Sequence, residues 1–500
     1  MVGTLAMGID LGTGSVKVGL FEPGDDVPVA CVGEAYELAP VPGHPTWSEA
    51  DPGRWRDALT AAVAKLPAEQ RRRVGTIGVT GLFPALIAMD EDGNALRPAI
   101  LYSDRRSVGQ ARELRERGLA DRIERTGGGE LTPGTTSVLS YLWLREVEPE
   151  VAERARWLGH GTTWMGAWMT GQVAMDRANA SMTGVFDTGA GRWSEELMEA
   201  LGIDPAQWPA PIQGSQPVGR LGGAAAQILG LPEDVPVALG GGDTSCAAVG
   251  SGCTEPGQCF LSSGTTDTLC LCLDEYRYDG RLYCAAHALP GRWLSMAPTM
   301  YTGGSVEWCG QLLGGEPGDP VERVIRLASS IPPGESGVVF LPYLMGERTP
   351  VRDPAATGVL HGMTPSTGPA EVARAVVDGG ALAIRTCLDA LPTENHMPGH
   401  ITIVGRPASS EVLNRARAAA TGLPVVALEF EEATLLGAAA CGAAAGGLVA
   451  RPADLTRPFL AHTDRLEPDP GAAEAYERLL PLYRDLYQAL KDRDLFDRLP

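Results

Sequence analysis

Near its N-terminus the chain reads Met7-Gly8-Ile9-Asp10-Leu11-Gly12-Thr13-Gly14-Ser15-Val16-Lys17-Val18-Gly19-Leu20-Phe21. An apolar run ends on an acid, glycines and hydroxyl residues follow, and apolar residues then alternate with Lys17 and Gly19. Alternation with a period of two is typical of a β-strand, so we predict a hairpin whose tip carries Asp10, Thr13 and Ser15. Glycine amides and hydroxyls suit a phosphate, and a carboxylate suits Mg²⁺. An ordinary hairpin with a glycine turn would use the same residues.

The composition is that of a globular protein with enough residues for two or three domains. The chain has 500 residues, of which 44% are hydrophobic and 21% are charged. Its net charge of −21 argues against nucleic acid or an anionic membrane as a partner, because both would be repelled. No basic and apolar leader precedes Gly8, and apolar runs such as Gly437–Ala450 are too rich in Ala and Gly to span a membrane. We therefore expect a cytoplasmic protein.

The ten cysteines raise the question of a metal site, since seven of them fall between Cys246 and Cys309. They include no Cys-x-x-Cys pair, and Cys270 and Cys272 lie in the apolar run Thr268–Leu273, which we expect to be a strand. We therefore favour buried free thiols in a reducing compartment over a zinc site.

A pattern like that of the first hairpin recurs in the second half of the chain. The strand-like run Val235–Leu239 leads into Gly240-Gly241-Gly242-Asp243, and Cys259–Leu269 holds Ser263-Gly264-Thr265-Thr266 between two apolar segments. Two halves of similar length, each with a turn of hydroxyl residues and glycine, suggest two similar domains with a phosphate held between them. We place the boundary near Asp234, so that residues 1–234 form an N-terminal domain and residues 235–500 a C-terminal domain.

The turn at Gly12-Thr13-Gly14 does not fit three familiar nucleotide motifs. A Rossmann site needs a helix that begins at the last glycine, whereas a strand-like sequence follows Gly14. The chain has no Gly-x-x-x-x-Gly-Lys-Ser/Thr, and it lacks the His-Arg-Asp and Asp-Phe-Gly elements of protein kinases. What remains is a cleft between two α/β domains that each carry a hairpin.

Several blocks of sequence, spread from about Met7 to Gly447, occur together. They are Gly8-Ile9-Asp10-Leu11-Gly12-Thr13, Trp47-Ser48-Glu49-Ala50-Asp51-Pro52, Arg97-Pro98-Ala99-Ile100-Leu101, Gly240-Gly241-Gly242-Asp243, Ser263-Gly264-Thr265-Thr266, His287-Ala288-Leu289-Pro290, Leu341-Pro342-Tyr343 and Gly346-Glu347-Arg348-Thr349-Pro350. Together they resemble the FGGY family of carbohydrate kinases, most closely its xylulokinase-like branch. The resemblance implies an α/β, two-domain actin/hexokinase-like (ribonuclease H-like) fold with a ligand cleft between the domains, and ATP and Mg²⁺ as cofactors.

The resemblance also implies roles for particular residues. Asp243 matches the catalytic base that accepts the proton of the sugar hydroxyl, although an aspartate there would also suit the N-cap of a helix that begins near Thr244. Asp10 matches the acid near Mg²⁺, and Asp243 is the second candidate metal ligand. The other residues expected at the nucleotide are Gly12, Thr13, Gly14, Ser15, Lys17, Gly264, Thr265, Thr266, Gly405, Arg406 and Ala408. The residues expected at the substrate are Trp47, Gly81, Leu82, Phe83, Pro84, Asp104 and Asp243.

For two of these residues a purely structural role fits the sequence equally well. Trp47 would also suit a hydrophobic core, and Asp104 would also suit a helix cap.

Two departures from the family pattern affect the ligands that we expect. Xylulokinases usually have Gln-Met-His after the glycine equivalent to Gly81, where this chain has Leu82-Phe83-Pro84. Since a buried hydroxyl without a partner costs about 1–3 kcal/mol, we expect a substrate other than standard D-xylulose, such as a less hydroxylated or differently shaped polyol. The family also expects a Gly-Gly-Gly-Ala turn where this chain has Gly405-Arg406-Pro407-Ala408. We therefore expect an altered nucleotide pocket, in which Arg406 stacks on adenine or meets a phosphate.

The sequence thus predicts an ATP-dependent kinase of a small sugar or polyol, with a homodimer as a candidate assembly. The alternative is a protein of the same fold whose nucleotide site is weakened and which acts in binding or regulation. Retention of Asp10, Asp243 and both hydroxyl-and-glycine turns favours the enzyme.

Overall fold

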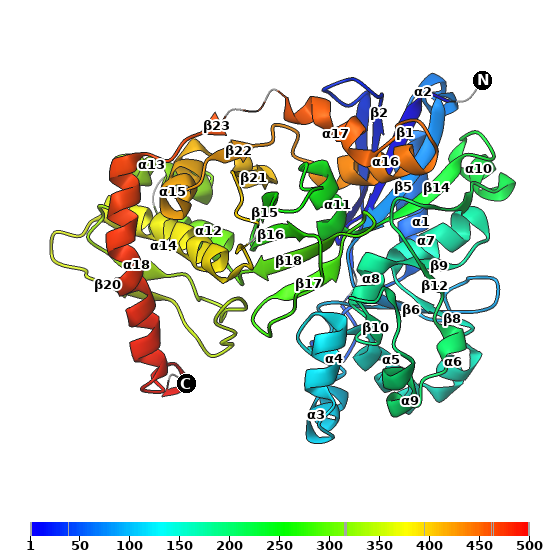
Figure 1. Cartoon of the computed structure of the whole chain (residues 1–500), viewed down its shortest axis with the longest axis horizontal. Helices are drawn as coiled ribbons and strands as arrows, with labels where there is room; N and C mark the ends of the chain where they lie inside the picture. Colours follow the sequence, from blue (N-terminus) through cyan, green and yellow to red (C-terminus); the bar gives the residue numbers. More distant parts are fainter. Residues whose placement is uncertain are drawn as a thin grey trace. The chain divides into compact units, whose positions relative to one another are not determined.

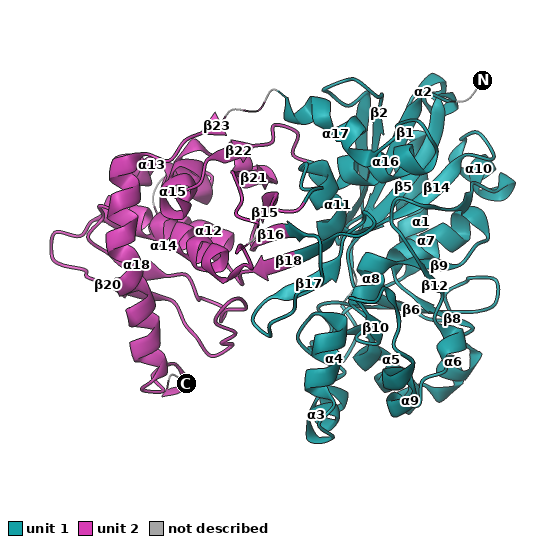
Figure 2. Cartoon of the chain, viewed as in Figure 1, with its two compact units in different colours: residues 1–255, 272–294, 432–461 teal, residues 256–271, 295–431, 462–500 magenta. Residues whose placement is uncertain are grey.

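The computed structural model of the chain describes residues 3–38, 40–314, 318–394, 396–461, 463 and 465–498. It divides into two compact units that are not consecutive halves of the sequence (Figure 2). Unit 1 comprises residues 1–255, 272–294 and 432–461, and unit 2 comprises residues 256–271, 295–431 and 462–500. The strand Pro236–Gly242, which directly follows the predicted boundary at Asp234, pairs inside unit 1. A domain boundary near Asp234 stays a prediction.

Unit 1 is built around a six-stranded sheet with the strand order β13-β14-β5-β1-β2-β3 (Figure 1). The bounds are β1 (Leu5–Leu11), β2 (Ser15–Phe21), β3 (Ala30–Ala35), β5 (Val74–Gly81), β13 (Pro217–Arg220) and β14 (Pro236–Gly242). Strand β1 is antiparallel to β2, which confirms the predicted hairpin, and β5 is parallel to both β1 and β14. Asp10 pairs with Lys17 in the ladder, so Asp10 lies inside β1 and only Thr13 and Gly14 form the exposed tip.

The rest of unit 1 consists of further strands and helices. A further sheet has the order β4-β7-β6-β8 and packs with the helices that follow it. The strand bounds are β4 (Glu49–Ala50), β6 (Ala85–Met89), β7 (Ala99–Leu101), β8 (Trp157–Gly159), β9 (Ala174–Asp176), β10 (Phe186–Asp187), β11 (Arg192–Trp193), β12 (Ala210–Ile212) and β17 (Tyr283–Ala286). The helix bounds are α1 (Pro52–Ala64), α2 (Ala68–Arg72), α3 (Val108–Glu116), α4 (Ala120–Gly127), α5 (Ser137–Val147), α6 (Pro149–Arg154), α7 (Gly161–Thr170), α8 (Arg177–Ser181), α9 (Glu195–Leu201), η1 (Pro205–Gln207), α10 (Gly223–Leu229), α11 (Asp243–Gly250), α16 (Ala433–Ala445) and α17 (Pro452–Leu460).

Local sequence signals explain two of these helices. Helix α1 begins at Pro52, and the Asp51 carboxylate at its N-cap accepts a hydrogen bond from the Gly53 amide at 2.9 Å. The Ala- and Gly-rich helix α16 packs against β1, β5 and α11. A Cβ atom at Gly437 would lie 1.8 Å from the Cys246 carbonyl oxygen, so the small residues are what allow α16 and α11 to approach this closely.

Unit 2 carries the second hairpin. Strands β15 (Cys259–Ser263) and β16 (Asp267–Leu273) are antiparallel, with Gly264, Thr265 and Thr266 as the turn, so this prediction is confirmed as well. Strand β15 is also parallel to β21, and β22 and β23 extend the same sheet. The helices α12, α13, α14 and α15 pack against one another, and α18 packs on α15 (Figure 1). The remaining bounds are β18 (Trp293–Pro298), α12 (Thr302–Leu312), α13 (Pro320–Ala328), β19 (Val339–Leu341), β20 (Val359–His361), α14 (Pro369–Ala390), β21 (Ile401–Val404), η2 (Arg406–Ser409), α15 (Glu411–Thr421), β22 (Val425–Ala427), β23 (Arg465–Leu466), α18 (Pro470–Lys491) and η3 (Phe496–Arg498).

The cysteines are free thiols, and every one except Cys31 is buried. Within the described ranges, no group of three or more His, Cys, Asp or Glu side chains is arranged to hold a metal ion. Nor does the described part of the chain contain a helix with the length and apolar character that a membrane crossing requires.

Candidate active site

Asp10 and Asp243 lie at the same edge of the unit 1 sheet. Strands β1 and β14 flank β5 and run parallel to it, so the carboxyl ends of all three strands meet at one edge. Asp10 pairs with Thr80 near the end of β1, and Asp243 follows directly on the last residue of β14. A hydrogen bond of 2.9 Å from the Thr80 hydroxyl to the Gly241 carbonyl oxygen holds β5 and β14 together at this point.

The two carboxylates influence each other electrostatically. Burial, and after it the negative charge of Asp243, raise the pKa of Asp10 to about 7, while Lys17 opposes the shift. Burial also raises the pKa of Asp243, against hydrogen bonds from Thr244 that lower it. Two acids whose charges repel at the end of a sheet form a donor set that suits a divalent cation, because a cation placed there would relieve the repulsion. The residues at this edge therefore fit Mg²⁺.

Asp243 is the first residue of α11, and Gly242, not Asp243, occupies the N-cap. The N-cap role considered for Asp243 is therefore wrong. Its Oδ1 atom accepts hydrogen bonds from the backbone amide and the hydroxyl of Thr244. In the described ranges no side chain or amide donates to Oδ2. The carboxylate is thus oriented through one oxygen, and the other oxygen is left for a ligand.

The first turn is held by a tyrosine that the sequence did not single out. The Tyr36 amide donates to the Gly14 carbonyl oxygen at 3.0 Å, and its hydroxyl donates to the Gly12 carbonyl oxygen. The Trp55 indole donates in turn to the Tyr36 hydroxyl at 2.9 Å. Lys17, expected at the nucleotide, forms a 2.6 Å ion pair with Glu432, and both side chains remain partly exposed.

Among the predicted substrate residues, Phe83 lies next to the catalytic candidate. A Cβ atom at Gly242 would lie within 2.3–2.5 Å of three atoms of the Phe83 ring, so the ring lies directly against the residue before Asp243. Gly81 pairs with Gly242 in the ladder. Leu82, in contrast, belongs to the main hydrophobic core of unit 1, and Pro84 is buried.

Trp47 and Asp104 are brought together by Arg106, which the sequence analysis did not identify. The Arg106 guanidinium lies 3.9 Å from the centre of a Trp47 ring and donates to both carboxylate oxygens of Asp104. The amides of Ser48 and Arg106 also donate to Asp104, which is buried. With four hydrogen bonds to protein groups, Asp104 is firmly oriented. A direct contact between Asp104 and a substrate stays a prediction.

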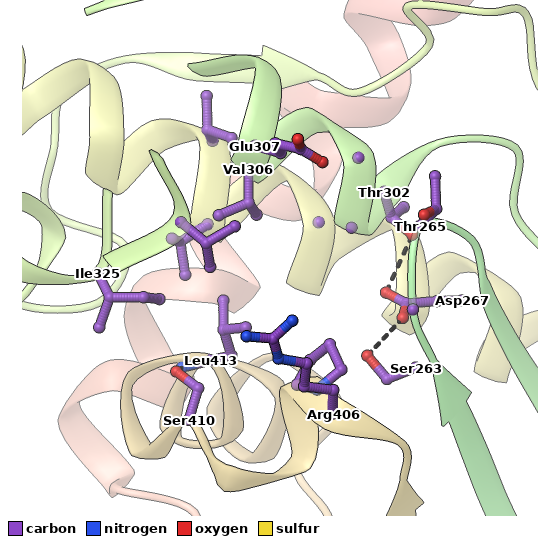
Figure 3. A pocket seen from close by; sticks show the side chains of 18 of the residues that line it. Ser263, Thr265, Asp267, Thr302, Val306, Glu307, Ile325, Arg406, Ser410 and Leu413 are labelled. Carbon is purple, nitrogen blue, oxygen red and sulfur yellow. Dashed lines mark hydrogen bonds between the residues drawn. The ribbon is translucent and has the colours of Figure 1, made fainter. Parts of the chain in front are cut away.

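Unit 2 contains a cavity of about 780 Å³ beside the second turn (Figure 3). Gly264 and Thr265 of that turn line it together with Arg406 of the predicted nucleotide loop, so the structure brings these two segments to one site. Thr266, Gly405 and Ala408 are not among its lining residues. The apolar part of the wall consists of Val306, Val321, Ile325, Val376, Val377, Ala381 and Leu413.

Arg406 points into this cavity (Figure 3). It is exposed, and no hydrogen bond or ion pair to its guanidinium occurs within the described residues. A cation without a partner beside a turn of amides and hydroxyls suits an anionic group of a ligand, and the apolar wall suits a flat, weakly polar group such as a base. The turn itself is fixed by α12, because a Cβ atom at Gly303 would lie 1.7 Å from the Gly264 carbonyl oxygen.

Comparison with known proteins identifies the family. The N-terminal domain of the FGGY family of carbohydrate kinases matches residues 5–250, and the C-terminal domain of that family matches residues 259–446. The chain therefore belongs to the FGGY family and is a carbohydrate kinase, an enzyme class whose phosphate donor is ATP.

Its relatives include two enzymes named xylulose kinase. The one from Escherichia coli strain K12 is 30% identical over 97% of this chain and 99% of that protein. The one from Klebsiella pneumoniae is 32% identical over 80% of this chain and 81% of that protein. The xylulokinase-like resemblance predicted from the sequence is confirmed.

Solved structures confirm the fold. The crystal structure of xylulose kinase from Rhodospirillum rubrum matches with a TM-score of 0.90 at 29% identity and covers 99% of this chain and 100% of that one. Plasmodium falciparum glycerol kinase with ADP matches with a TM-score of 0.88 at 18% identity, over 98% of each chain, and shows the fold alone. The chain has the two-domain actin/hexokinase-like α/β fold of these kinases.

Proposed function

We propose that this kinase transfers the γ-phosphate of ATP to a hydroxyl group of a small sugar or polyol, with Asp243 as the general base. The observation that carries the proposal is the pair of coupled carboxylates at one edge of the unit 1 sheet. Asp10 and Asp243 occupy positions where parallel strands end, which is where α/β folds place their reactive groups. Phosphoryl transfer needs mainly such positioning and charge neutralisation.

The orientation of Asp243 supports a role in proton transfer. Thr244 donates twice to Oδ1. Oδ2 then accepts the proton of the substrate hydroxyl as its oxygen forms a bond to the γ-phosphorus and the bond from the γ-phosphorus to the bridging oxygen of ADP breaks. Asp10 and Asp243 are the residues that would hold Mg²⁺, which when bound neutralises phosphate charge.

The cavity of unit 2 is the proposed nucleotide site. The amides and hydroxyls of Gly264 and Thr265 suit the phosphates, and the apolar wall suits the base. At the position of Arg406 the family pattern has a glycine. The arginine adds a charged side chain, which reaches into the cavity (Figure 3). An ionic contact with the phosphates is therefore the role that we assign to it.

Phe83 is the residue on which we base the expected difference between this enzyme's substrate and D-xylulose. Its ring lies against Gly242, one residue before the proposed base. An aromatic ring offers no hydrogen bond to a sugar hydroxyl, so a substrate with fewer hydroxyl groups at this position is favoured over D-xylulose. Leu82, buried in the core, does not contribute to this preference.

Two measurements test the proposal. Thermal stability is measured with ATP, ADP and other nucleotides, with and without Mg²⁺, and we expect ATP with Mg²⁺ to raise the unfolding temperature. ADP release is then measured over a panel of ketoses, polyols and deoxy sugars that includes D-xylulose. We expect turnover with at least one panel member, and a higher kcat/KM for a less hydroxylated compound than for D-xylulose. The absence of stabilisation by any nucleotide would contradict the kinase and favour a binding protein.

A further inference from the structure

A buried polar network lies beneath the second turn, at the floor of the unit 2 cavity. Arg417, Asp267 and Ser263 line the cavity, yet their exposed fractions are only 6%, 3% and 6%. Charged side chains of this kind are rarely buried without a partner. The partners here belong to three different segments, namely the β15–β16 hairpin, the start of α12 and the helix α15.

Asp267 is the centre of the network. Its Oδ1 atom accepts a hydrogen bond of 2.7 Å from the Ser263 hydroxyl, and its Oδ2 atom accepts one of 2.9 Å from the Thr302 hydroxyl (Figure 3). The Asp267 amide donates to the Thr299 hydroxyl at 3.1 Å. Because Ser263 and Asp267 are the two residues that flank the turn, these contacts clamp its base from both strands and from the start of α12.

Arg417 joins this clamp to the nucleotide loop. Its guanidinium Nη2 atom donates to the Ser263 hydroxyl at 2.6 Å and lies 3.6 Å from Asp267 Oδ1. Its Nη1 atom donates to the Asn414 side-chain oxygen at 3.2 Å, and the Asn414 amide group donates to the Ala408 carbonyl oxygen at 2.6 Å. Ala408 belongs to η2, the 3₁₀ turn that carries Arg406. One continuous chain of polar contacts therefore runs from the phosphate turn to the loop of Arg406.

We propose that Arg417 and Asp267 are a positioning pair that holds the Gly264–Thr266 turn and the Arg406 loop in register, and that they thereby set the affinity of the cavity for the donor nucleotide. The inference rests on the proposed function, which places the nucleotide in this cavity. Arg417 and Asp267 act through the two segments that they connect. Errors of about 1 Å in such positioning can cost about 100-fold in rate.

Stability alone does not account for the pair. Desolvation of two buried charges offsets much of their attraction, so a buried ion pair is weak evidence for a stabilising role. The same unit holds a second buried ion pair, Arg374–Asp378, with a distance of 2.6 Å and side chains that are 2% and 4% exposed. Neither Arg374 nor Asp378 lines the cavity, which makes that pair a matched control.

The test compares Arg417→Gln with Arg374→Gln. For both variants we would measure the unfolding temperature, the Kd for ATP and ADP, and the KM for the sugar identified with the wild-type enzyme. We expect Arg417→Gln to weaken nucleotide binding about 10- to 100-fold and to leave the KM for the sugar within about twofold of wild type. Arg374→Gln should lower the unfolding temperature without changing nucleotide affinity.

A second variant addresses the chance that Arg417→Gln, which leaves Asp267 buried without a cation, does not fold. Asn414→Leu breaks the link between Arg417 and the Ala408 carbonyl oxygen and leaves the ion pair intact. We expect Asn414→Leu to weaken nucleotide binding about 3- to 10-fold, because the hydrogen bonds that connect Arg417 to the Ala408 carbonyl oxygen are lost.

Three results would count against the inference. Equal nucleotide affinity in wild type and Asn414→Leu, together with a loss in Arg417→Gln no larger than that in Arg374→Gln, would overturn it. A rise in the KM for the sugar as large as the loss of nucleotide affinity would also overturn it, since that would show a general loss of structure. A wild-type protein that binds no nucleotide would overturn the proposed function and this inference together.

Discussion

The two hairpins of this kinase look alike in sequence and lie in different physical environments. In unit 1 the tip of the β1–β2 turn is exposed, its neighbours are charged, and Tyr36 and the partly exposed pair Lys17–Glu432 hold it. In unit 2 the β15–β16 turn lies against α12, and the buried pair Asp267–Arg417 lies beneath it. The first hairpin carries the charged side chains of Asp10 and Lys17, and the second hairpin borders a cavity.

This difference shows that one motif can serve two tasks. Asp10 lies where strand ends converge, so its carboxylate is coupled to Asp243. The second hairpin has an acid too, but both oxygens of Asp267 accept hydrogen bonds from protein groups. A carboxylate with an oxygen free for a ligand suits ligand and proton chemistry, whereas a carboxylate whose two oxygens are both hydrogen-bonded within the protein suits positioning. The proposed chemistry therefore lies with unit 1 and the proposed nucleotide contacts with unit 2.

The largest effect that we expect comes from Asp243→Asn. Asparagine keeps an oxygen for the hydrogen bonds from Thr244 and removes the base, so kcat should fall about 100- to 10,000-fold. The unfolding temperature should stay close to wild type, and so should the Kd for ATP measured without Mg²⁺, since Asp243 is also a proposed Mg²⁺ ligand. The measurements are ADP release, calorimetry of nucleotide binding and thermal unfolding. If the Asp243→Asn enzyme is active, Asp243 is not the general base, and the proposed chemistry does not lie with unit 1.

A smaller effect should follow from Gly303→Ala. The new Cβ atom would lie 1.7 Å from the Gly264 carbonyl oxygen, so the turn must move, and kcat/KM for ATP should fall about 10- to 100-fold. Steady-state kinetics with ATP varied at saturating sugar measures this. The comparison is Gly14→Ala at the first turn, where a Cβ atom meets no protein atom within 4 Å and the loss should be smaller. A larger loss for Gly14→Ala would mean that the first turn is the more constrained one.

Glu347 gives a prediction about pH, because it supports the segment beside the second hairpin. Its Oε1 atom accepts hydrogen bonds from the amides of Met300 at 2.6 Å and Arg348 at 2.8 Å. Burial raises the pKa of Glu347 from 4.5 to about 7, so the folded state favours the neutral acid. The contribution of Glu347 to stability is then greatest below pH 4.5 and falls by about 3 kcal/mol in total as the pH rises from 4.5 to about 7.

The variant Glu347→Gln tests this, since glutamine does not ionise and can keep the same two hydrogen bonds. Relative to wild type it should gain stability between pH 5 and pH 8, as measured by denaturant unfolding at several pH values. Glu69→Gln, at an exposed position of α2, is the control and should show no such trend. A difference between wild type and Glu347→Gln that does not change with pH would contradict the prediction.

The smallest effect should come from Lys17→Met in the first hairpin. The Lys17 and Glu432 side chains are 41% and 32% exposed, and ion pairs of this kind contribute at most about 1 kcal/mol. We therefore expect the free energy of unfolding to fall by less than about 1 kcal/mol, and the difference to shrink in high salt. A loss of more than about 2 kcal/mol, insensitive to salt, would contradict the prediction that the Lys17–Glu432 pair contributes little to stability.

Much of the fold was predictable because its signals are local. Alternating apolar residues predicted β2, apolar runs beside turns of glycine and hydroxyl residues predicted β1, β15 and β16, and Asp51-Pro52 predicted the start of α1. The residues that hold the site were not predictable, because their partners are distant in sequence. Tyr36 and Arg106 contact groups up to 59 positions away (106 − 47 = 59), and Arg417 contacts Ser263 across 154 positions.

By itself the sequence determined the family, the two hairpins and the residue types at their turns, since these depend on side-chain chemistry and short-range periodicity. Only the tertiary structure decided that Asp10 is coupled to Asp243, that Phe83 lies against Gly242 while Leu82 is in the core, and that Asp267 is buried with Arg417. Each of these outcomes depends on which strands and helices become neighbours. The packing of these neighbouring elements determines which side chains are buried and which charges interact, so burial and electrostatic coupling are properties of the folded chain.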